Sequence, residues 1–282
     1  MKIKYFIPLL VLQLFFVSCA VNPVTGRKQA SMVSNEALFP QSFAAYQETL
    51  KAEKISTNKT YNDQVLRVGK RIQASVEEFF KQAGMPNYLD GYEWQYTVIE
   101  SDKLNAWCMP GGKVAFYTGI LPVCMDDNGV AVVMGHEIAH AVANHGAERM
   151  SQDNIKNAIA AAGAIALGAG GVSSSSTELI LQAYGTGASL GMLTYSRKHE
   201  SEADEMGLLF MALAGYDPIH APEFWKRMEA KGKEDGGGSP PEFLSTHPSS
   251  GTRINDLKRL MPIAQEVYKT KSPQPYLSTR GK

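Results

Sequence analysis

The sequence predicts an α+β fold that is mainly helical. One stretch has apolar residues at the spacing of an amphipathic helix: Val65, Val68, Ile72, Val76 and Phe79. A later stretch alternates as a half-buried strand does, with Trp94, Tyr96 and Val98 on one face. We therefore expect helices at about 35–56 and 60–83, and a small β-sheet within residues 91–120.

The composition is that of a folded domain without excess charge. The chain has 282 residues, of which 44% are hydrophobic and 20% charged, with 28 basic and 28 acidic side chains. This hydrophobic fraction excludes wholesale disorder. The charge balance gives no basic surface for nucleic acid, so we expect no nucleic-acid partner.

The N-terminus has the layout of a signal peptide, which we place at residues 1–18. Two lysines precede an apolar stretch at 5–17 that is too short to span a bilayer comfortably. Cys19 follows a small residue, as in bacterial lipoproteins; ordinary secretion with an incidental cysteine is the alternative. We expect a lipid on Cys19 that holds the protein on a membrane surface. Because Ala20 follows, we expect the outer membrane, facing the periplasm.

Beyond the signal peptide we expect an extended N-terminal arm at 19–34, one domain at 35–262 and a C-terminal tail at 263–282. Within the domain, residues 158–192 form an unusual insert that is alanine-rich, then rich in glycine and serine, then helical again. Two interpretations stay open: a pair of packed helices with a mobile connection, or a lid or membrane-touching element.

Cys108 and Cys124 are the cysteines of the predicted mature chain, and they flank a segment of strand composition at 111–119. In an oxidising compartment an even pair favours a disulfide, which we expect here. Buried free thiols are the alternative, since a sequence does not fix the distance between two sulfur atoms.

The most informative motif is His-Glu-Ile-Ala-His at residues 136–140. Residues four apart share a helix face, so His136 and His140 can aim ring nitrogens at one metal ion, with Glu137 beside them to move a proton. The motif predicts zinc-dependent peptide hydrolysis, on a helix at about 128–151; a partly exposed polar pair is the alternative. His145 is turned roughly 140° from His140 on such a helix, so we do not expect it to be a ligand.

A third metal ligand is expected downstream, because catalytic zinc usually takes three protein ligands and leaves a fourth position open. Glu200 is the candidate, and Asp204 lies on the same helical face. Asp204 is suited to accept the free ring N–H of a ligand histidine. An acidic solvated face is the alternative, but the following residues are apolar.

Together these motifs resemble the HtpX-like and CAAX prenyl protease-type zinc metalloendopeptidases of the gluzincin clan. The resemblance covers roughly residues 22–262 and looks closest to the single-domain periplasmic lipoprotein members. It implies a gluzincin-type domain that binds one Zn²⁺ per chain, with a small β-sheet bordering the active-site cleft. It rests on the motif at 136–140 and on Ser196-Arg197 with Glu200 and Ala203-Asp204, Asn105-Ala106-Trp107 with Pro110-Gly111-Gly112, and Thr246-His247-Pro248 with Arg253.

The resemblance also places His247 and Arg253 near the zinc. His247 is expected either to donate to the developing oxyanion or to occupy the metal as a fourth, inhibitory ligand. A turn residue ahead of Pro248 is the alternative. Arg253 is expected to anchor the substrate or to orient the active-site carboxylates.

Metallopeptidases commonly bind substrate as a strand added to a sheet edge. We expect that edge at four residues: Lys113, Val114, Ala115 and Phe116. The segment from Asn105 to Met109 would line the cleft beside it, and an ordinary core strand is the alternative.

The sequence therefore predicts a zinc metalloendopeptidase that cleaves unfolded or misassembled proteins of the bacterial cell envelope, with Glu137 as general base. A protein with purely structural zinc would not need Glu137. An envelope chaperone or assembly factor with latent or conditional proteolysis is the remaining alternative.

Overall fold

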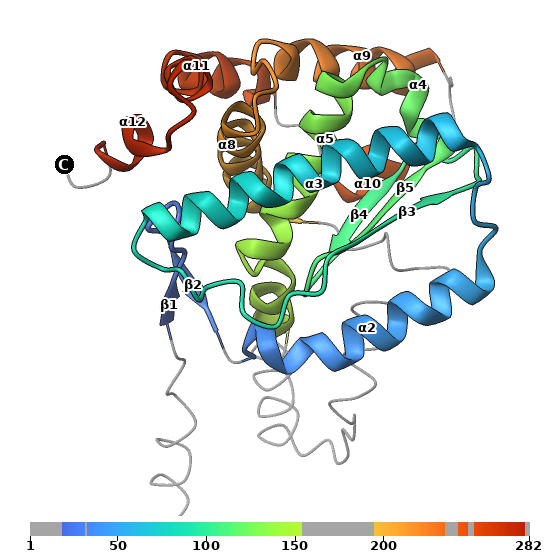
Figure 1. Ribbon diagram of the computed structural model, residues 1–282, viewed down its shortest axis with the longest axis horizontal. Helices are drawn as coiled ribbons and strands as arrows, with labels where there is room; N and C mark the ends of the chain where they lie inside the picture. Colours follow the sequence, from blue (N-terminus) through green and yellow to red (C-terminus); the bar gives the residue numbers. More distant parts are fainter. Residues whose placement is uncertain (1–18, 32, 154–194, 235–241, 248–250, 280–282) are drawn as a thin grey trace, which may run out of the picture.

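The computed structural model describes residues 19–31, 33–153, 195–234, 242–247 and 251–279. Helices surround a three-stranded sheet (Figure 1), and the expected α+β, mainly helical fold is confirmed. The insert at 158–192 and the signal peptide at 1–18 lie outside the described residues.

The first two long helices, α2 (Asn35–Ala52) and α3 (Lys59–Gln82), match the expected ranges closely. Each begins after a side chain that accepts a hydrogen bond from the first turn, Ser34 for α2 and Asn58 for α3. The row of apolar residues on α3 is buried in the main core, as its spacing predicted. In Figure 1, α3 crosses the front of the molecule and α2 lies below the sheet.

The sheet has the order β3-β5-β4, made of β3 (Gln95–Ile99), β5 (Lys113–Tyr117) and β4 (Ala106–Met109). β3 runs parallel to β5, and β4 runs antiparallel on its other side. The expected substrate edge at residues 113–116 is therefore wrong. Both sides of β5 are already hydrogen-bonded to neighbouring strands and all five of its residues are buried, so β5 has no free edge.

The expected disulfide is also absent, because Cys108 and Cys124 are buried free thiols. The strand register gives the reason. Cys108 lies opposite Val114 near the start of β5, whereas Cys124 ends α4 (Leu121–Cys124), which follows Tyr117 at the far end of β5. Those strand positions are separated by about 10 Å, so the chain leaves β5 toward Cys124 at the end away from Cys108.

Two central helices, α5 (Asp127–Val142) and α8 (Arg197–Leu213), carry the motifs. α5 begins after Asp126, whose side chain accepts a backbone N–H of the first turn. It ends nine residues before the expected 151, because Asn144 takes a left-handed conformation with φ 59°. Asparagine is one of the few residues that tolerate this conformation after a helix end. A separate helical segment at 145–153 follows.

Three further helices follow: α9 (His220–Glu234), α10 (Glu242–Thr246) and α11 (Arg253–Thr270). In Figure 1, α9 and α11 lie at the top and α10 lies behind α3, beside the sheet. A short helix, α12 (Gln274–Leu277), follows on the left. The expected boundary between residues 262 and 263 falls inside α11, so the helix continues across it.

The expected N-terminal arm contains a small antiparallel hairpin of β1 (Cys19–Val21) and β2 (Lys28–Ala30). Its turn is closed by Asn22, whose side-chain oxygen accepts the N–H groups of Val24 and Thr25. We name residues 19–30 the N-terminal hairpin.

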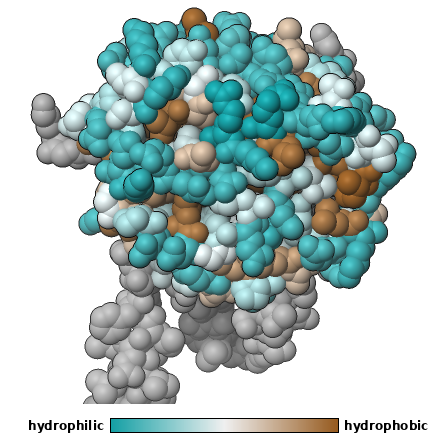
Figure 2. All heavy atoms as spheres, in the orientation of Figure 1, coloured by the Kyte–Doolittle hydropathy of each residue, from teal (hydrophilic) through white to brown (hydrophobic). Residues whose placement is uncertain are grey.

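In the described part of the chain, no helix combines the length and apolarity needed to cross a membrane. The face in Figure 2 is mostly hydrophilic, with hydrophobic residues in separate patches.

Candidate metal centre

The metal-motif helices cross at a contact between two glycines. A Cβ atom on Gly135 of α5 would lie 2.8 Å from the carbonyl oxygen of Gly207 on α8, and one on Gly207 would lie 2.8 Å from the backbone nitrogen of His136. Because neither glycine has a side chain, the two backbones approach directly. The crossing places His136 and His140 on α5 against Glu200 and Asp204 on α8.

Four buried side chains meet at one point: His136, His140, Glu200 and His247. Their metal-ligating atoms all lie within 4.8 Å of one another. Five separations measured among these nitrogen and oxygen atoms lie between 3.1 and 3.5 Å. Tetrahedral zinc with bonds of about 2.0–2.1 Å requires its ligands to be about 3.3 Å apart, so the cluster has the right size for zinc.

The contacts of the Nδ1 atoms of His136 and His140 indicate whether their Nε2 atoms, which face the cluster, carry a proton. His136 Nδ1 lies 3.0 Å from Oδ1 of Asp204, and His140 Nδ1 lies 2.9 Å from Nδ1 of His145. When each Nδ1–H donates outward, each Nε2 carries a lone pair instead of a proton. These two Nε2 atoms are only 3.1 Å apart, and the Glu200 carboxylate adjoins them. Only a cation satisfies so many electron pairs at one point, so the donor set fits zinc.

Arg253 holds the two carboxylates of α8 in place. Its Nε lies 2.6 Å from Oδ2 of Asp204 and its Nη2 lies 2.5 Å from Oε2 of Glu200. The guanidinium is buried and lies over the Trp225 ring at 3.8 Å from the centroid. Of its two expected roles, the structure places Arg253 where it orients the carboxylates.

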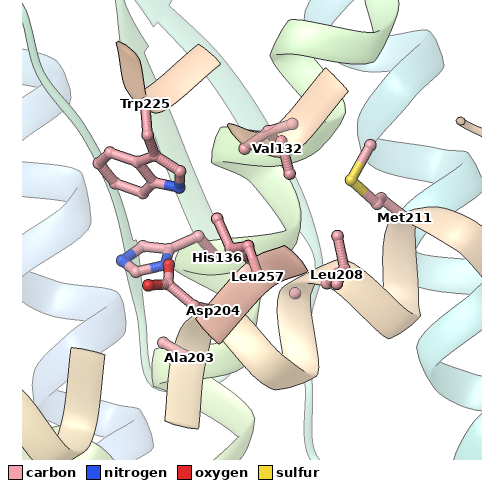
Figure 3. A pocket seen from close by; sticks show the side chains of 10 residues that line it. Val132, His136, Ala203, Asp204, Leu208, Met211, Trp225 and Leu257 are labelled. Atoms are coloured by element: carbon pink, nitrogen blue, oxygen red, sulfur yellow. The ribbon is translucent and has the colours of Figure 1, made fainter. Parts of the chain in front are cut away.

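The contact between His136 and Asp204 lies in mostly apolar surroundings. In Figure 3 the Asp204 carboxylate lies against the His136 ring, with the Trp225 indole close by. The small cavity beside the pair is otherwise walled mostly by apolar side chains, including Val132 and Leu208. A low-polarity surround strengthens the interaction of the ring N–H with the carboxylate.

Glu137 lies at the inner edge of the cluster. Its Oε1 is 3.5 Å from Nε2 of His247 and has no hydrogen-bond partner among the residues that the structure describes. Burial raises the pKa of the Glu137 carboxyl to about 8, with His247 acting in the opposite direction. A carboxyl whose pKa lies near neutrality is suited to take up and release a proton.

The ligand side chains have shifted pKa values in the absence of metal. For His136, burial lowers the pKa, but Asp204 and Glu200 outweigh it and raise it overall. For His140, burial dominates and the pKa lies well below its ordinary value. Burial would raise the pKa of Glu200, but the histidines around it hold it well below its usual range.

The sequence did not reveal the residues behind His140. His145 was correctly left out of the ligand set, but it is buried and contacts His140, and its Nε2 lies 2.9 Å from Oε2 of Glu202. The prediction assumed a continuous helix. Asn144, a frequent residue just after a helix end, was the one signal that α5 stops early.

Two other predicted site residues lie in different surroundings. Lys113 is buried in β5, where its Nζ donates to the backbone carbonyl oxygen of Glu93. Cys19 begins β1 of the N-terminal hairpin, and nothing in the structure tests its lipidation.

Residues 67–261 match the model of peptidase family M48. The chain belongs to this family. The M48 match and the metalloendopeptidase relatives below confirm the expected enzyme class, a zinc metalloendopeptidase, and its Zn²⁺. The HtpX-like resemblance agrees with M48 at this coarse level.

Three relatives illustrate the range of similarity. Mitochondrial metalloendopeptidase OMA1 of Schizosaccharomyces pombe is 32% identical over 251 residues, which are 89% of this chain and 69% of that protein. Metalloendopeptidase OMA1, mitochondrial, of Homo sapiens is 30% identical over 273 residues, which are 92% of this chain and 49% of that protein. Beta-barrel assembly-enhancing protease of Escherichia coli O157:H7 is 28% identical over 169 residues, which are 58% of this chain and 34% of that protein. The M48 chain thus spans about half of the human relative.

The expected outer-membrane location is contradicted by these relatives. Those that match most of the chain are named as mitochondrial proteins of fungi and animals, whereas the two bacterial relatives match 58% and 57% of it. A single residue after Cys19 is a weaker guide to location than similarity over most of the chain.

Proposed function

We propose that this M48 peptidase cleaves peptide bonds within unfolded or misassembled proteins, in protein quality control, and that it belongs to the HtpX-like branch. His136, His140 and Glu200 are the zinc ligands and Glu137 is the general base. The observation that carries the site assignment is the convergence of histidine ring nitrogens and a carboxylate on one buried point. When bound, zinc supplies a Lewis acid for the scissile carbonyl and lowers the pKa of water.

The protein side chains have distinct tasks in this proposal. Glu137 accepts a proton at its free Oε1 and passes it to the leaving amine. Asp204 fixes the tautomer of His136 by accepting its Nδ1–H. Arg253 holds Asp204 and Glu200 in place through its hydrogen bonds, and its guanidinium is buried behind them.

We propose β4, rather than β5, as the strand on which substrate adds. Asn105 O accepts from Tyr117 N, and Met109 O accepts from Gly112 N. Since alternate residues of an antiparallel strand bond to the same partner, Ala106 and Cys108 direct their backbone groups away from β5. Ala106 N–H is bonded by Asn105 Oδ1, and we propose that the Ala106 carbonyl and the backbone groups of Cys108 bind an extended peptide. All four residues of β4 are buried, so substrate binding requires the groups that cover this strand to move aside.

His247 is proposed to act as a fourth, inhibitory ligand. Its Nδ1 lies 3.2 Å from His136 Nε2 and 3.1 Å from Glu200 Oε1, as a coordinating atom would. An oxyanion donor would instead stand off from the ligands to leave room for substrate. His247→Ala is therefore expected to keep zinc and to raise the cleavage rate several-fold, by freeing the open position. A fall in cleavage at unchanged zinc content would favour the oxyanion role.

An alternative function is assembly assistance with conditional proteolysis. It is favoured by one observation, the name of the Escherichia coli relative, "Beta-barrel assembly-enhancing protease". In that case the chain would bind an assembling client in its folded complex without cleaving it.

Attachment to a membrane surface through a lipid on Cys19 stays a proposal that rests on the sequence. Mass spectrometry of the mature N-terminus would decide it, because a diacylglyceryl group adds a defined mass to a peptide that begins at Cys19.

The experiment that tests the function is digestion of reduced, unfolded proteins, with and without a zinc chelator, followed by mapping of the cleavage sites. We expect internal cleavages that stop on chelation and return on addition of zinc. Cleavage confined to chain ends would contradict an endopeptidase. Client binding without chelator-sensitive cleavage would favour the assembly factor.

A further inference from the structure

The two motif histidines are supported in different ways. His136 contacts the carboxylate of Asp204, which in turn accepts a hydrogen bond from Arg253. Behind His140, a second arginine and carboxylate act through an intervening imidazole, and this arginine belongs to the N-terminal hairpin. We propose that Arg27 is a positioning residue for the metal centre, through which the N-terminal hairpin sets the geometry of His140. The inference rests on the proposed zinc site.

The chain of contacts has three links. His140 Nδ1 lies 2.9 Å from Nδ1 of His145, and His145 Nε2 lies 2.9 Å from Oε2 of Glu202. Arg27 Nε then donates to the same Oε2 at 2.6 Å. The hydroxyl of Thr25, in the turn of the hairpin, donates to the other oxygen of Glu202.

One arrangement of protons satisfies every link. If His140 binds zinc through Nε2, its Nδ1 carries a hydrogen and donates to His145 Nδ1. His145 then carries its own hydrogen on Nε2, which faces Glu202. The carboxylate of Glu202 thus fixes the tautomer of His145, and His145 fixes that of His140. The chain of hydrogen bonds from His140 through His145 ends on the buried carboxylate of Glu202, and Arg27 compensates the negative charge of that carboxylate.

Arg27 also anchors the helical segment that carries His145. Its two terminal nitrogens donate to Glu148 at 2.9 and 2.6 Å, and Glu148 accepts from His199 Nε2 at 3.1 Å. The His199 ring stacks on His145 with centroids 4.6 Å apart and an interplanar angle of 23°. One guanidinium therefore joins the N-terminal hairpin, segment 145–153 and α8 around a single imidazole.

This cluster is a support and not a second cation site. The guanidinium of Arg27 already lies between the Glu148 and Glu202 carboxylates and compensates part of their negative charge. Both carboxylates are buried, so loss of Arg27 would leave two uncompensated charges next to His145. The geometry of His140 would then relax, although Arg27 touches neither zinc nor substrate.

The test compares full-length Arg27→Ala with Arg67→Ala, which removes an exposed ion pair to Asp127 on α5. Zinc affinity is measured by chelator competition, and ligand geometry by the visible spectrum of the cobalt-substituted protein. We expect Arg27→Ala to weaken zinc binding by about ten-fold, to alter the cobalt spectrum and to lower kcat more than KM. Arg27→Lys should recover part of the loss, and Arg67→Ala should match the unsubstituted protein.

A purely structural role predicts a different result. Arg27→Ala would then lower the unfolding temperature of the zinc-free and zinc-bound proteins alike, with unchanged zinc affinity and cobalt spectrum, and this outcome would overturn the inference. If Arg27→Ala does not fold, Glu202→Gln removes the charge at nearly constant volume and carries the same expectation. Failure of the unsubstituted protein to bind zinc would instead refute the proposed function.

A double variant tests the route through His145. In a His145→Phe background the connection to His140 is already cut, so Arg27→Ala should cause no further loss of zinc affinity. Fully additive losses would show that Arg27 acts on the metal centre by another path, and would overturn the proposed chain of contacts.

Discussion

At the residue scale, the metal centre is governed by where its protons lie. His136 donates outward to Asp204, and His140 donates outward to His145, so both present bare nitrogens inward. Without a metal this arrangement is unfavourable, because lone pairs face one another, and binding of protons to these groups relieves the repulsion. Neighbouring carboxylates raise the pKa of His136, and burial raises that of Glu137 to about 8.

Zinc binding at pH 7 is therefore expected to release on the order of one proton per chain, because the ion displaces protons held by these groups. Calorimetric titration of the zinc-free protein in buffers of different ionisation enthalpy measures this number. The apparent affinity should rise with pH between about 6 and 8. An affinity independent of pH, with no proton release, would contradict the assigned protonation states.

At the element scale, the site depends on how closely α5 crosses α8. The glycine pair at 135 and 207 permits this approach. Gly207→Ala is expected to cost roughly 1–3 kcal/mol of stability through overpacking, even though alanine favours a helix by about 1 kcal/mol. It should also weaken zinc retention, because Glu200 moves away from His136. Urea unfolding and metal analysis after dialysis measure the two effects.

Gly251→Ala is the matched control for that substitution. Among the described residues, a Cβ atom there meets nothing within 4 Å, so stability and zinc content should stay unchanged. If Gly207→Ala behaved like this control, the close helix crossing would not be what assembles the site.

Comparison of the helices and strands with their predictions shows which structural features local sequence patterns can indicate. Helix α3 follows from the spacing of its apolar residues, and four-residue spacing paired His136 with His140 and Glu200 with Asp204. Local patterns do not state which strand lies in the middle of a sheet, so β5 was mistaken for an edge. The same lack of register information led to the expected disulfide. Likewise, no pattern joins Arg27 to Glu202, which lie 175 positions apart.

At the scale of the whole molecule, buried charges couple stability to pH. Burial raises the pKa of Glu137 from an ordinary 4.5 to about 8, so the folded zinc-free protein binds one more proton than the unfolded chain between these values. The contribution of Glu137 to stability should therefore fall as pH rises from about 5 to 8, by an amount on the order of a few kcal/mol, whereas the lowered pKa values of the buried His140 and His145 act in the opposite direction at the acidic end of this range. Urea unfolding of the zinc-free protein across this range measures the slope.

Glu137→Gln removes this titrating group and is the control. Its zinc-free form should lose less stability over the same pH range than the unsubstituted protein. Identical slopes for the two proteins would mean that the Glu137 carboxyl is already ionised when the chain is folded.

The whole molecule also brings distant segments to one site. The N-terminal hairpin, segment 145–153, α8 and the start of α11 all contribute groups around the ligands on α5. Parts of the chain far from the motif at 136–140 therefore take part in holding the zinc.

The most direct test of the central claim is the cleavage rate of Glu137→Gln, measured on an unfolded protein with zinc content determined on the same sample. The account predicts one zinc per chain and a rate about 10²- to 10⁴-fold below that of the unsubstituted enzyme, as expected for loss of a general base. A zinc-loaded Glu137→Gln protein that cleaves at a near-normal rate would contradict it.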